Sequence, residues 1–250
     1  MSTPIDISEQ AGVRYLHFGS EWIQGAMRLR NPNALELTYT REMMAGLLLK
    51  PDHWPRNALL IGLGAASLTR FLYHHCPQTR LHVVEIEPRV VAAARQFFNL
   101  PEDDRRLKIT IADGARHIFE PGPRYDCILV DGYDRNARAG ALDTEPFYLA
   151  VRSRLSEHGL MAVNLFGRSR GYKASLERIL RAFDDRALAF PSCDSGNVIA
   201  LASSGDPLSL SLAEIRERAQ ALKTRTGLDL LPTVTRLEQA GSLPGGRLLL

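Results

Sequence analysis

The fold is decided by residues 58–72, which read A-L-L-I-G-L-G-A-A-S-L-T-R-F-L. The apolar run that opens this stretch predicts a buried strand, and Gly62 and Gly64 predict a tight turn after it. The pattern from Ala66 to His75 is typical of a helix. Strand, glycine turn and helix form the first part of a nucleoside-binding βαβ unit, since glycines let the backbone approach a ligand closely.

An acidic residue stands where the second strand of that unit should end. The apolar run 81–84 leads into Glu85, which lies 21 residues after Gly64. A carboxylate at this place can accept hydrogen bonds from both ribose hydroxyls. The third glycine of the dinucleotide pattern is replaced by Ser67, so a pyrophosphate-cradling turn is not expected. A tight turn without a ligand is the alternative, and the spacing of Glu85 argues against it.

Apolar strands alternate with helical patterns from residue 58 to residue 203. This alternation predicts an α/β fold with a doubly wound, mostly parallel, seven-stranded sheet. The expected strands are 58–61, 81–85, 107–111, 125–131, 159–165, 187–190 and 198–202. The expected helices are 66–75, 89–98, 115–119, 145–155 and 173–183.

Three parts of the chain are expected. Residues 1–50 should form a short N-terminal β-hairpin (13–18 and 22–29) followed by one amphipathic helix (35–49). Residues 51–205 should form the nucleoside-binding catalytic core. Residues 206–250 should form a C-terminal helical extension, whose first helix begins at the capping box Ser211-Leu212-Ala213-Glu214.

The composition is that of an ordinary globular enzyme or binding protein, with 45% hydrophobic and 24% charged residues among 250. The net charge of +3 comes without a dense Lys/Arg block, so nucleic-acid binding is not expected. Cys76, Cys127 and Cys193 are far apart and without metal-ligand spacing, which favours a reducing cytoplasm and no metal site. No apolar run approaches ~18 residues, so no membrane span is expected.

Acidic residues follow the second, third and fourth predicted strands. They are Glu85, Asp113, Asp131 and Asp134. In open α/β sheets, ligands bind beyond the carboxyl ends of the strands. A single acid at such a place is often a helix cap or turn former, but four together predict a pocket for an adenosine and a second group beside it.

Five motifs between residues 35 and 203 carry a specific resemblance. They are I-G-L-G at 61–64, V-V-E-I-E-P at 83–88, A-D-G-A-R at 112–116, Y-D-C-I-L-V-D-G-Y-D at 125–134 and E-P-F-Y at 145–148. With them the chain resembles the polyamine aminopropyltransferases, the spermidine synthase family. That family shares the Rossmann-type fold of S-adenosylmethionine-dependent methyltransferases. The pair Asp131-x-x-Asp134 is the most discriminating element, because plain methyltransferases do not generally carry it.

The resemblance implies a role for each site residue. Asp131 falls on the catalytic carboxylate that holds the attacking amine, Asp134 on its partner that grips the cationic acceptor, and Tyr39 on a tyrosine at the gate. Glu85 falls on the residue that binds the ribose hydroxyls, and Asp113 on the acid that accepts from the adenine amino group. The nucleoside-binding set is completed by Gly62, Gly64, Ile86, Gly114 and Asp131.

The sequence departs from the family pattern at four places. Ala65 replaces the turn aspartate that binds the donor's amino group, and Arg28 aligns with a glutamine of the N-terminal hairpin. Arg135 and Arg138 follow the Asp-x-x-Asp pair, where a proline is usual. These arginines either point to solvent or, if they face the site, imply that a substrate carries a carboxylate.

The resemblance implies a transferase that moves an aminopropyl group from decarboxylated S-adenosylmethionine to a diamine. No prosthetic group is expected, and the nucleoside is a co-substrate. A cytoplasmic homodimer is expected, with a small-molecule nucleoside donor and an amine acceptor as its partners. The alternatives are a methyltransferase that uses S-adenosylmethionine, favoured by Ala65, and a non-catalytic dimeric nucleoside-binding protein.

Overall fold

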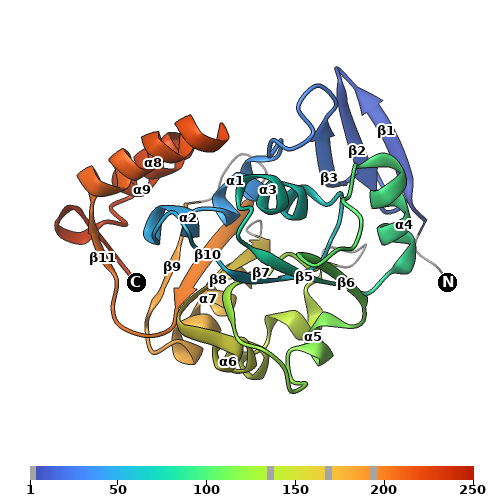
Figure 1. Ribbon diagram of the computed structural model, residues 1–250. Coiled ribbons are helices and arrows are strands. Elements are labelled where there is room, and N and C mark those ends of the chain that lie inside the picture. Colours follow the sequence, from blue (N-terminus) through green and yellow to red (C-terminus); the bar gives the residue numbers. More distant parts are fainter. Residues whose placement is uncertain (1–3, 134–137, 167–170, 192–195) are drawn as a thin grey trace.

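A seven-stranded sheet forms the centre of the molecule in the computed structural model, which describes residues 4–133, 138–166, 171–191 and 196–250 (Figure 1). The strand order is β6-β5-β4-β7-β8-β10-β9. The strands are β4 (Asn57–Ile61), β5 (Arg80–Glu85), β6 (Leu107–Ile111), β7 (Tyr125–Val130), β8 (Leu155–Phe166), β9 (Ala187–Ala189) and β10 (Asn197–Ser203). The predicted fold class is confirmed.

The pairing of these strands creates a crevice beside β4. β4 pairs in parallel with β5 on one side and with β7 on the other, while β10 runs antiparallel to β8. The chain leaves β4 toward β5 and returns later to β7, so the strand order reverses at this point. Ligands of doubly wound sheets bind at such a switch point, beyond the carboxyl ends of the strands.

Helices cover both faces of the sheet, because successive strand residues point to opposite sides. Ala58 and Leu60 of β4 pack in one hydrophobic cluster, while Leu59 and Ile61 pack in the other. The helices of the first side are α1 (Thr38–Met43), α2 (Gly46–Leu49), α3 (Ser67–His75), α4 (Pro88–Phe97), α8 (Leu212–Thr226) and α9 (Leu231–Gln239). Those of the second side are α5 (Gly114–His117), α6 (Glu145–Arg154) and α7 (Gly171–Ala182).

The N-terminal appendage is a three-stranded sheet of β1 (Asp6–Gln10), β2 (Val13–His17) and β3 (Ile23–Arg28). The expected hairpin is therefore present, and β1 is an addition to it. The sequence D-I-S-E-Q lacks a hydrophobic strand pattern, and most of its residues are exposed. In Figure 1 this sheet stands at the opposite end of the molecule from α8 and α9.

The single helix expected over 35–49 is wrong, because the structure divides it into α1 and α2. The helix breaks after Met43, and Gly46, a weak helix former, begins the second piece. A 3-10 turn, η1 (Gly140–Asp143), precedes α6.

The C-terminal region begins with the predicted capping box, in which Ser211 and Glu214 bond each other's backbone N–H groups at the start of α8. The weakly patterned tail holds α9, the turn η2 (Pro244–Gly246) and β12 (Arg247–Leu249), which pairs with β11 (Ser209–Ser211). None of the described helices combines the length and apolar character needed to cross a membrane. The division into three parts stays a prediction.

Candidate active site

A cleft of about 460 Å³ lies at the switch point, between the carboxyl ends of the parallel strands and the N-terminal sheet. The structure brings together there all the predicted site residues that it describes. They are Tyr39, Gly62, Gly64, Glu85, Ile86, Asp113, Gly114 and Asp131. Asp134 and Arg135 lie outside the described residues.

The glycine turn forms the floor of the cleft beside β7. Gly62 has φ +97°, a backbone conformation that side-chain-bearing residues rarely adopt. A Cβ at this residue would lie 2.3 Å from the carbonyl oxygen of Asp131. The Asp131 N–H in turn donates a 2.9 Å hydrogen bond to the carbonyl of Ile61. Because Gly62 has no side chain, the glycine turn can pack directly against the backbone of Asp131.

Glu85 is buried at the end of β5 and holds the turn in shape. Its Oε2 accepts from the N–H of Leu63 and its Oε1 from the N–H of Glu87, both at 2.9 Å. Burial raises the pKa of Glu85, and these backbone donors oppose the rise because they favour the carboxylate. Each carboxylate oxygen has a second lone-pair direction, so a ribose hydroxyl can still donate to it.

Ile86 and Asp113 flank the outer part of the cleft. The Ile86 side chain is 66% exposed, although it is apolar. An exposed branched side chain at a cleft is suited to pack against the flat face of a base. Asp113 caps α5 by accepting from the N–H of Ala115 at 2.8 Å. In this capping hydrogen bond the acceptor is one carboxylate oxygen of Asp113, Oδ1.

Asp131 lies at the end of β7 and is held from two sides. Its Oδ2 accepts from the hydroxyl of Tyr39 at 3.2 Å, and its Oδ1 accepts from Nδ2 of Asn164 at 2.9 Å. Burial raises the pKa of Asp131, whereas the bonds from Asn164 and Tyr39 lower it. Burial also raises the pKa of Tyr39 well above its usual range, as does the charge of Asp131, so Tyr39 acts as a hydrogen-bond donor.

Asn164 is a site residue that the sequence did not reveal. It is 7% exposed, it lines the cleft from β8, and its Oδ1 has no hydrogen-bond partner among the described residues. The hydroxyl of Tyr133 donates a 2.5 Å hydrogen bond to the backbone carbonyl oxygen of Asn164. An acceptor oxygen without a partner beside Asp131 is suited to an incoming N–H group.

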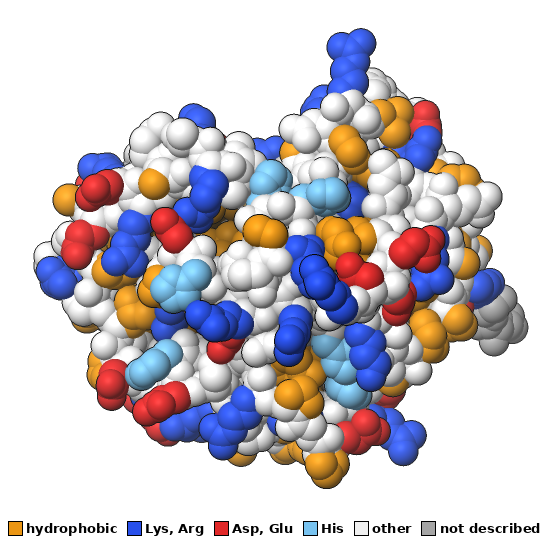
Figure 2. Space-filling view, in the orientation of Figure 1, with side chains coloured by type: hydrophobic (Ala, Val, Ile, Leu, Met, Phe, Trp, Pro, Cys, Tyr) orange, Lys and Arg blue, Asp and Glu red, His pale blue; other side chains and the backbone are white. Residues whose placement is uncertain are grey.

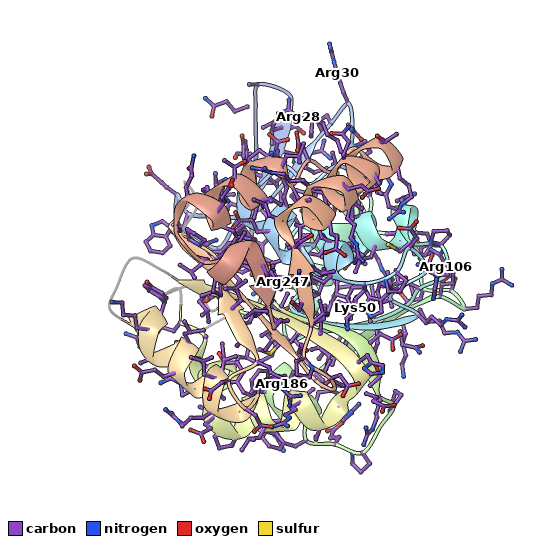
Figure 3. The ribbon with its side chains drawn as sticks, turned by 90° about the vertical axis from the view of Figure 1, so that its left-hand side faces the viewer. Arg28, Arg30, Lys50, Arg106, Arg186 and Arg247 are labelled. Atoms are coloured by element: carbon purple, nitrogen blue, oxygen red, sulfur yellow. The ribbon has the colours of Figure 1, made fainter. Side chains whose placement is uncertain are left out.

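The N-terminal sheet supplies a different residue from the one expected. Gln24 lines the cleft, whereas Arg28 forms an ion pair with Glu36 at 2.6 Å (Figure 3). Arg28 is therefore not among the residues that line the cleft, and its alignment with the family's glutamine stays a prediction.

Two further departures from the family pattern are placed by the structure. Ala65 is buried, and a Cβ added to Gly25 would lie 2.5 Å from the Ala65 Cβ, so the N-terminal sheet covers this position. Arg138 borders the cleft and is exposed, which fits the alternative that its side chain points to solvent. A positive side chain therefore borders a cleft that also holds the acids Glu85 and Asp131.

Comparisons with known proteins identify the family to which this chain is similar. Residues 36–167 match the spermine/spermidine synthase domain. A polyamine aminopropyltransferase of Chromobacterium violaceum is 37% identical over 246 residues, which cover 98% of this chain and 94% of that protein.

Two solved structures extend the comparison. A probable spermidine synthase from Corynebacterium glutamicum has a TM-score of 0.72 at 19% identity, covering 90% of this chain and 91% of that one, and so shares the fold. Human methyltransferase-like protein 13 in complex with SAH has a TM-score of 0.68 at 27% identity, covering 76% of this chain and 93% of that one.

Proposed function

This chain belongs to the spermine/spermidine synthase family, and from that premise we propose that it transfers an aminopropyl group from decarboxylated S-adenosylmethionine to a diamine. The observation that carries the proposal is the half-buried carboxylate of Asp131, held by Tyr39 and Asn164 at the edge of a nucleoside-sized cleft. The nucleoside is a co-substrate, bound and released in each turnover.

The proposed reaction is attack by a primary amine on the carbon next to a sulfonium. The C–S bond breaks as the C–N bond forms, the sulfur keeps the electron pair, and the new ammonium loses a proton. An alkylammonium has a pKa near ~10 and an ordinary aspartic acid one near ~3.9. This gap of ~6 units corresponds to ~8 kcal/mol, too much for a solvated aspartate to act as the base.

The surroundings of Asp131 reduce that gap in pKa. Burial raises the pKa of its carboxyl, and the donors Tyr39 and Asn164 keep it from rising further. We therefore assign to Asp131 the orientation of an amine that already has a lone pair, with Asn164 Oδ1 as a second acceptor for its N–H groups. The role of Asp134, gripping the distal part of the cationic acceptor, stays part of the proposal.

The donor site is proposed on the other side of the cleft. Glu85 would accept hydrogen bonds from the ribose hydroxyls, and Asp113 would accept one from the adenine amino group. Ile86 would pack against the base. Gly62 and Gly64 leave room for the chain that joins the ribose to the sulfonium. These assignments come from the resemblance to the family, and the position of the residues around one cleft supports them.

The test is a mass-spectrometric assay of the purified protein with putrescine and either donor. With decarboxylated S-adenosylmethionine we expect spermidine and methylthioadenosine in equal amounts. With S-adenosylmethionine we expect neither product. Methylated putrescine from S-adenosylmethionine, without spermidine from the decarboxylated donor, would favour the methyltransferase alternative and refute aminopropyl transfer.

A homodimer located in the cytoplasm is proposed as well. Trp22 and Ile23, at the start of β3, are 51% and 47% exposed where they border the cleft, and a sheet of three short strands favours packing on the core or on a second subunit. Cys76 and Cys127 are free and buried, as in a reducing compartment. Basic and acidic side chains are interspersed on the face in Figure 2, which fits small-molecule substrates better than nucleic acid. A monomer in light scattering at micromolar concentration would refute the dimer.

A further inference from the structure

Helix α1 carries Tyr39, and its own sequence does little to fix its orientation. It has six residues, and its N-cap residue, Leu37, makes no side-chain capping bond. Isolated helices shorter than ~12 residues are marginal in water, so tertiary contacts must hold α1 in place. Thr40 and Arg41 bond only nearby carbonyls in the contacts observed, those of Leu37, Leu35 and Glu36.

The side chains of α1 make long-range hydrogen-bonding contacts in two directions. Tyr39 reaches Asp131, 92 positions away. Glu42 reaches the C-terminal helix α9, where it forms an ion pair with Arg236 and accepts a 3.2 Å hydrogen bond from Thr233, 191 positions away. Residues three apart lie on neighbouring parts of a helix surface, so a rotation of α1 that moves Glu42 also moves Tyr39.

The contact between Glu42 and α9 is buried. The Glu42 side chain is 0% exposed, Thr233 is 5% exposed, and the Arg236 side chain is 29% exposed. In Figure 3 the C-terminal helices α8 and α9 lie on the side of the molecule that faces the viewer. The acid of this pair therefore lies beneath the C-terminal extension and not at the protein surface.

The pair is poorly built as a source of stability. Glu42 Oε2 and Arg236 Nε are both buried without a hydrogen-bond partner in the part of the chain that the structure describes. Burying two charges costs desolvation, and an ion pair recovers that cost only when the remaining polar atoms are satisfied. A buried contact that leaves polar atoms without partners fits a positioning role better than a stabilising one.

We infer that Arg236 and Thr233 of the C-terminal extension hold α1, through Glu42, in the orientation that presents the Tyr39 hydroxyl to Asp131. Arg236 is thus a positioning residue for the reaction, and it is not among the residues that line the cleft. The inference rests on the proposed function for its kinetic consequence, and its structural consequence at Asp131 is independent of turnover.

The kinetic test is a double-mutant cycle of Arg236→Gln with Tyr39→Phe. Arg236→Gln alone should lower kcat by roughly tenfold or more, since a misplacement of ~1 Å can cost ~100-fold. In the Tyr39→Phe background the same substitution should lower kcat by less than about twofold, because the hydroxyl that it positions is gone. Arg236→Lys should restore part of the loss. Independent, multiplicative effects would overturn the inference.

Matched variants separate positioning from general damage. Arg216 of α8 and Glu238 of α9 form an exposed ion pair that does not involve α1, so Arg216→Gln should leave kcat unchanged. Arg236→Gln leaves the charge of Glu42 buried, and Thr233→Val is the milder variant if that protein does not fold. Thr233→Val should lower kcat a few-fold, and again only when Tyr39 is present. An unchanged kcat in Thr233→Val, with a changed one in Arg216→Gln, would also overturn the inference.

A measurement without substrates distinguishes failure of this inference from failure of the proposed function. The side-chain carboxyl of Asp131 is followed by 13C NMR through a pH titration, with its signal assigned by its loss in Asp131→Asn. Arg236→Gln should raise the pKa of Asp131 as Tyr39→Phe does, and the double variant should show no further rise. An unchanged pKa in Arg236→Gln contradicts the inference, whether or not the wild-type protein transfers an aminopropyl group.

Discussion

The hydroxyl of Tyr39 donates a 3.2 Å hydrogen bond to Oδ2 of Asp131, from a helix 92 positions earlier in the chain. The bond connects the N-terminal part of the protein to the end of β7. It also stabilises the charged form of a carboxyl whose burial favours the neutral form. The ionisation state of Asp131 therefore depends on Tyr39.

Tyr39→Phe should move the acid limb of the activity profile to higher pH. Tyr39 lowers the pKa of Asp131 by donating to its carboxylate, so removal of the hydroxyl raises that pKa. Asp131 must be ionised to hold an amine, and activity falls as the pH drops through its pKa. The check is kcat/KM against pH for both proteins. An acid limb at the same or a lower pH in Tyr39→Phe would contradict the assignment.

Glu85→Gln should weaken binding of an adenosyl ligand. The amide replaces one carboxylate oxygen by an NH2 group and removes the charge that strengthens the bonds to the ribose hydroxyls. The loss is about 1.5–3 kcal/mol, or roughly 10–100-fold in Kd, measured by calorimetry with methylthioadenosine. Glu87→Gln is the control, because Glu87 pairs with Arg89 nearby. Equal affinities in wild type and Glu85→Gln would show that Glu85 does not bind the ribose hydroxyls.

Gly62→Ala should destabilise the protein more than Gly227→Ala does. Both glycines have positive φ, +97° and +75°, and a Cβ in the left-handed region costs about 1–2 kcal/mol. At Gly227 nothing lies within 4 Å of the added Cβ, whereas at Gly62 it meets the Asp131 carbonyl at 2.3 Å. Urea unfolding gives both free energies. Equal losses of unfolding free energy would show that the glycine turn at Gly62 and the end of β7 are not in close contact.

His82 should make the protein less stable in mild acid. Burial lowers the pKa of His82 to about 4, helped by the neighbouring His117. An unfolded imidazole takes up its proton near 6.5, so between that pH and about 4 the unfolded state binds more protons and stability falls as pH falls.

The measurement compares Tm at pH 7 and pH 5. The wild type should lose more Tm over this interval than His82→Asn, while exposed His53→Asn should behave like wild type. An equal loss in His82→Asn and wild type would show that His82 does not resist protonation in the folded protein.

The core of the fold was predictable because its signals are local. The glycine turn at Gly62 and the period-two strands are encoded in a few consecutive residues, and Glu85, Asp113 and Asp131 were found because strand ends of a parallel sheet share one edge. The same logic missed Asn164. It lies 33 positions after Asp131, among apolar residues near the carboxyl end of β8, and only the pairing of β7 with β8 brings the two together.

Other features depend on tertiary contacts that no local pattern carries. Glu42 has the sequence character of an exposed helix residue, and it is buried because α9 packs over it. β1 is polar, and its strand conformation comes from pairing with β2. Gln24 and Arg28 lie in the same strand, and only the tertiary structure shows that Gln24 lines the cleft while Arg28 pairs with Glu36.

The most direct test of the account is the turnover of Asp131→Asn with decarboxylated S-adenosylmethionine and putrescine, both saturating. The amide keeps the volume of the side chain and loses the charge that orients the amine. We expect kcat to fall by at least ~100-fold, while calorimetry gives an unchanged affinity for methylthioadenosine. A wild-type rate in Asp131→Asn would contradict the central claim that this carboxylate holds the attacking amine.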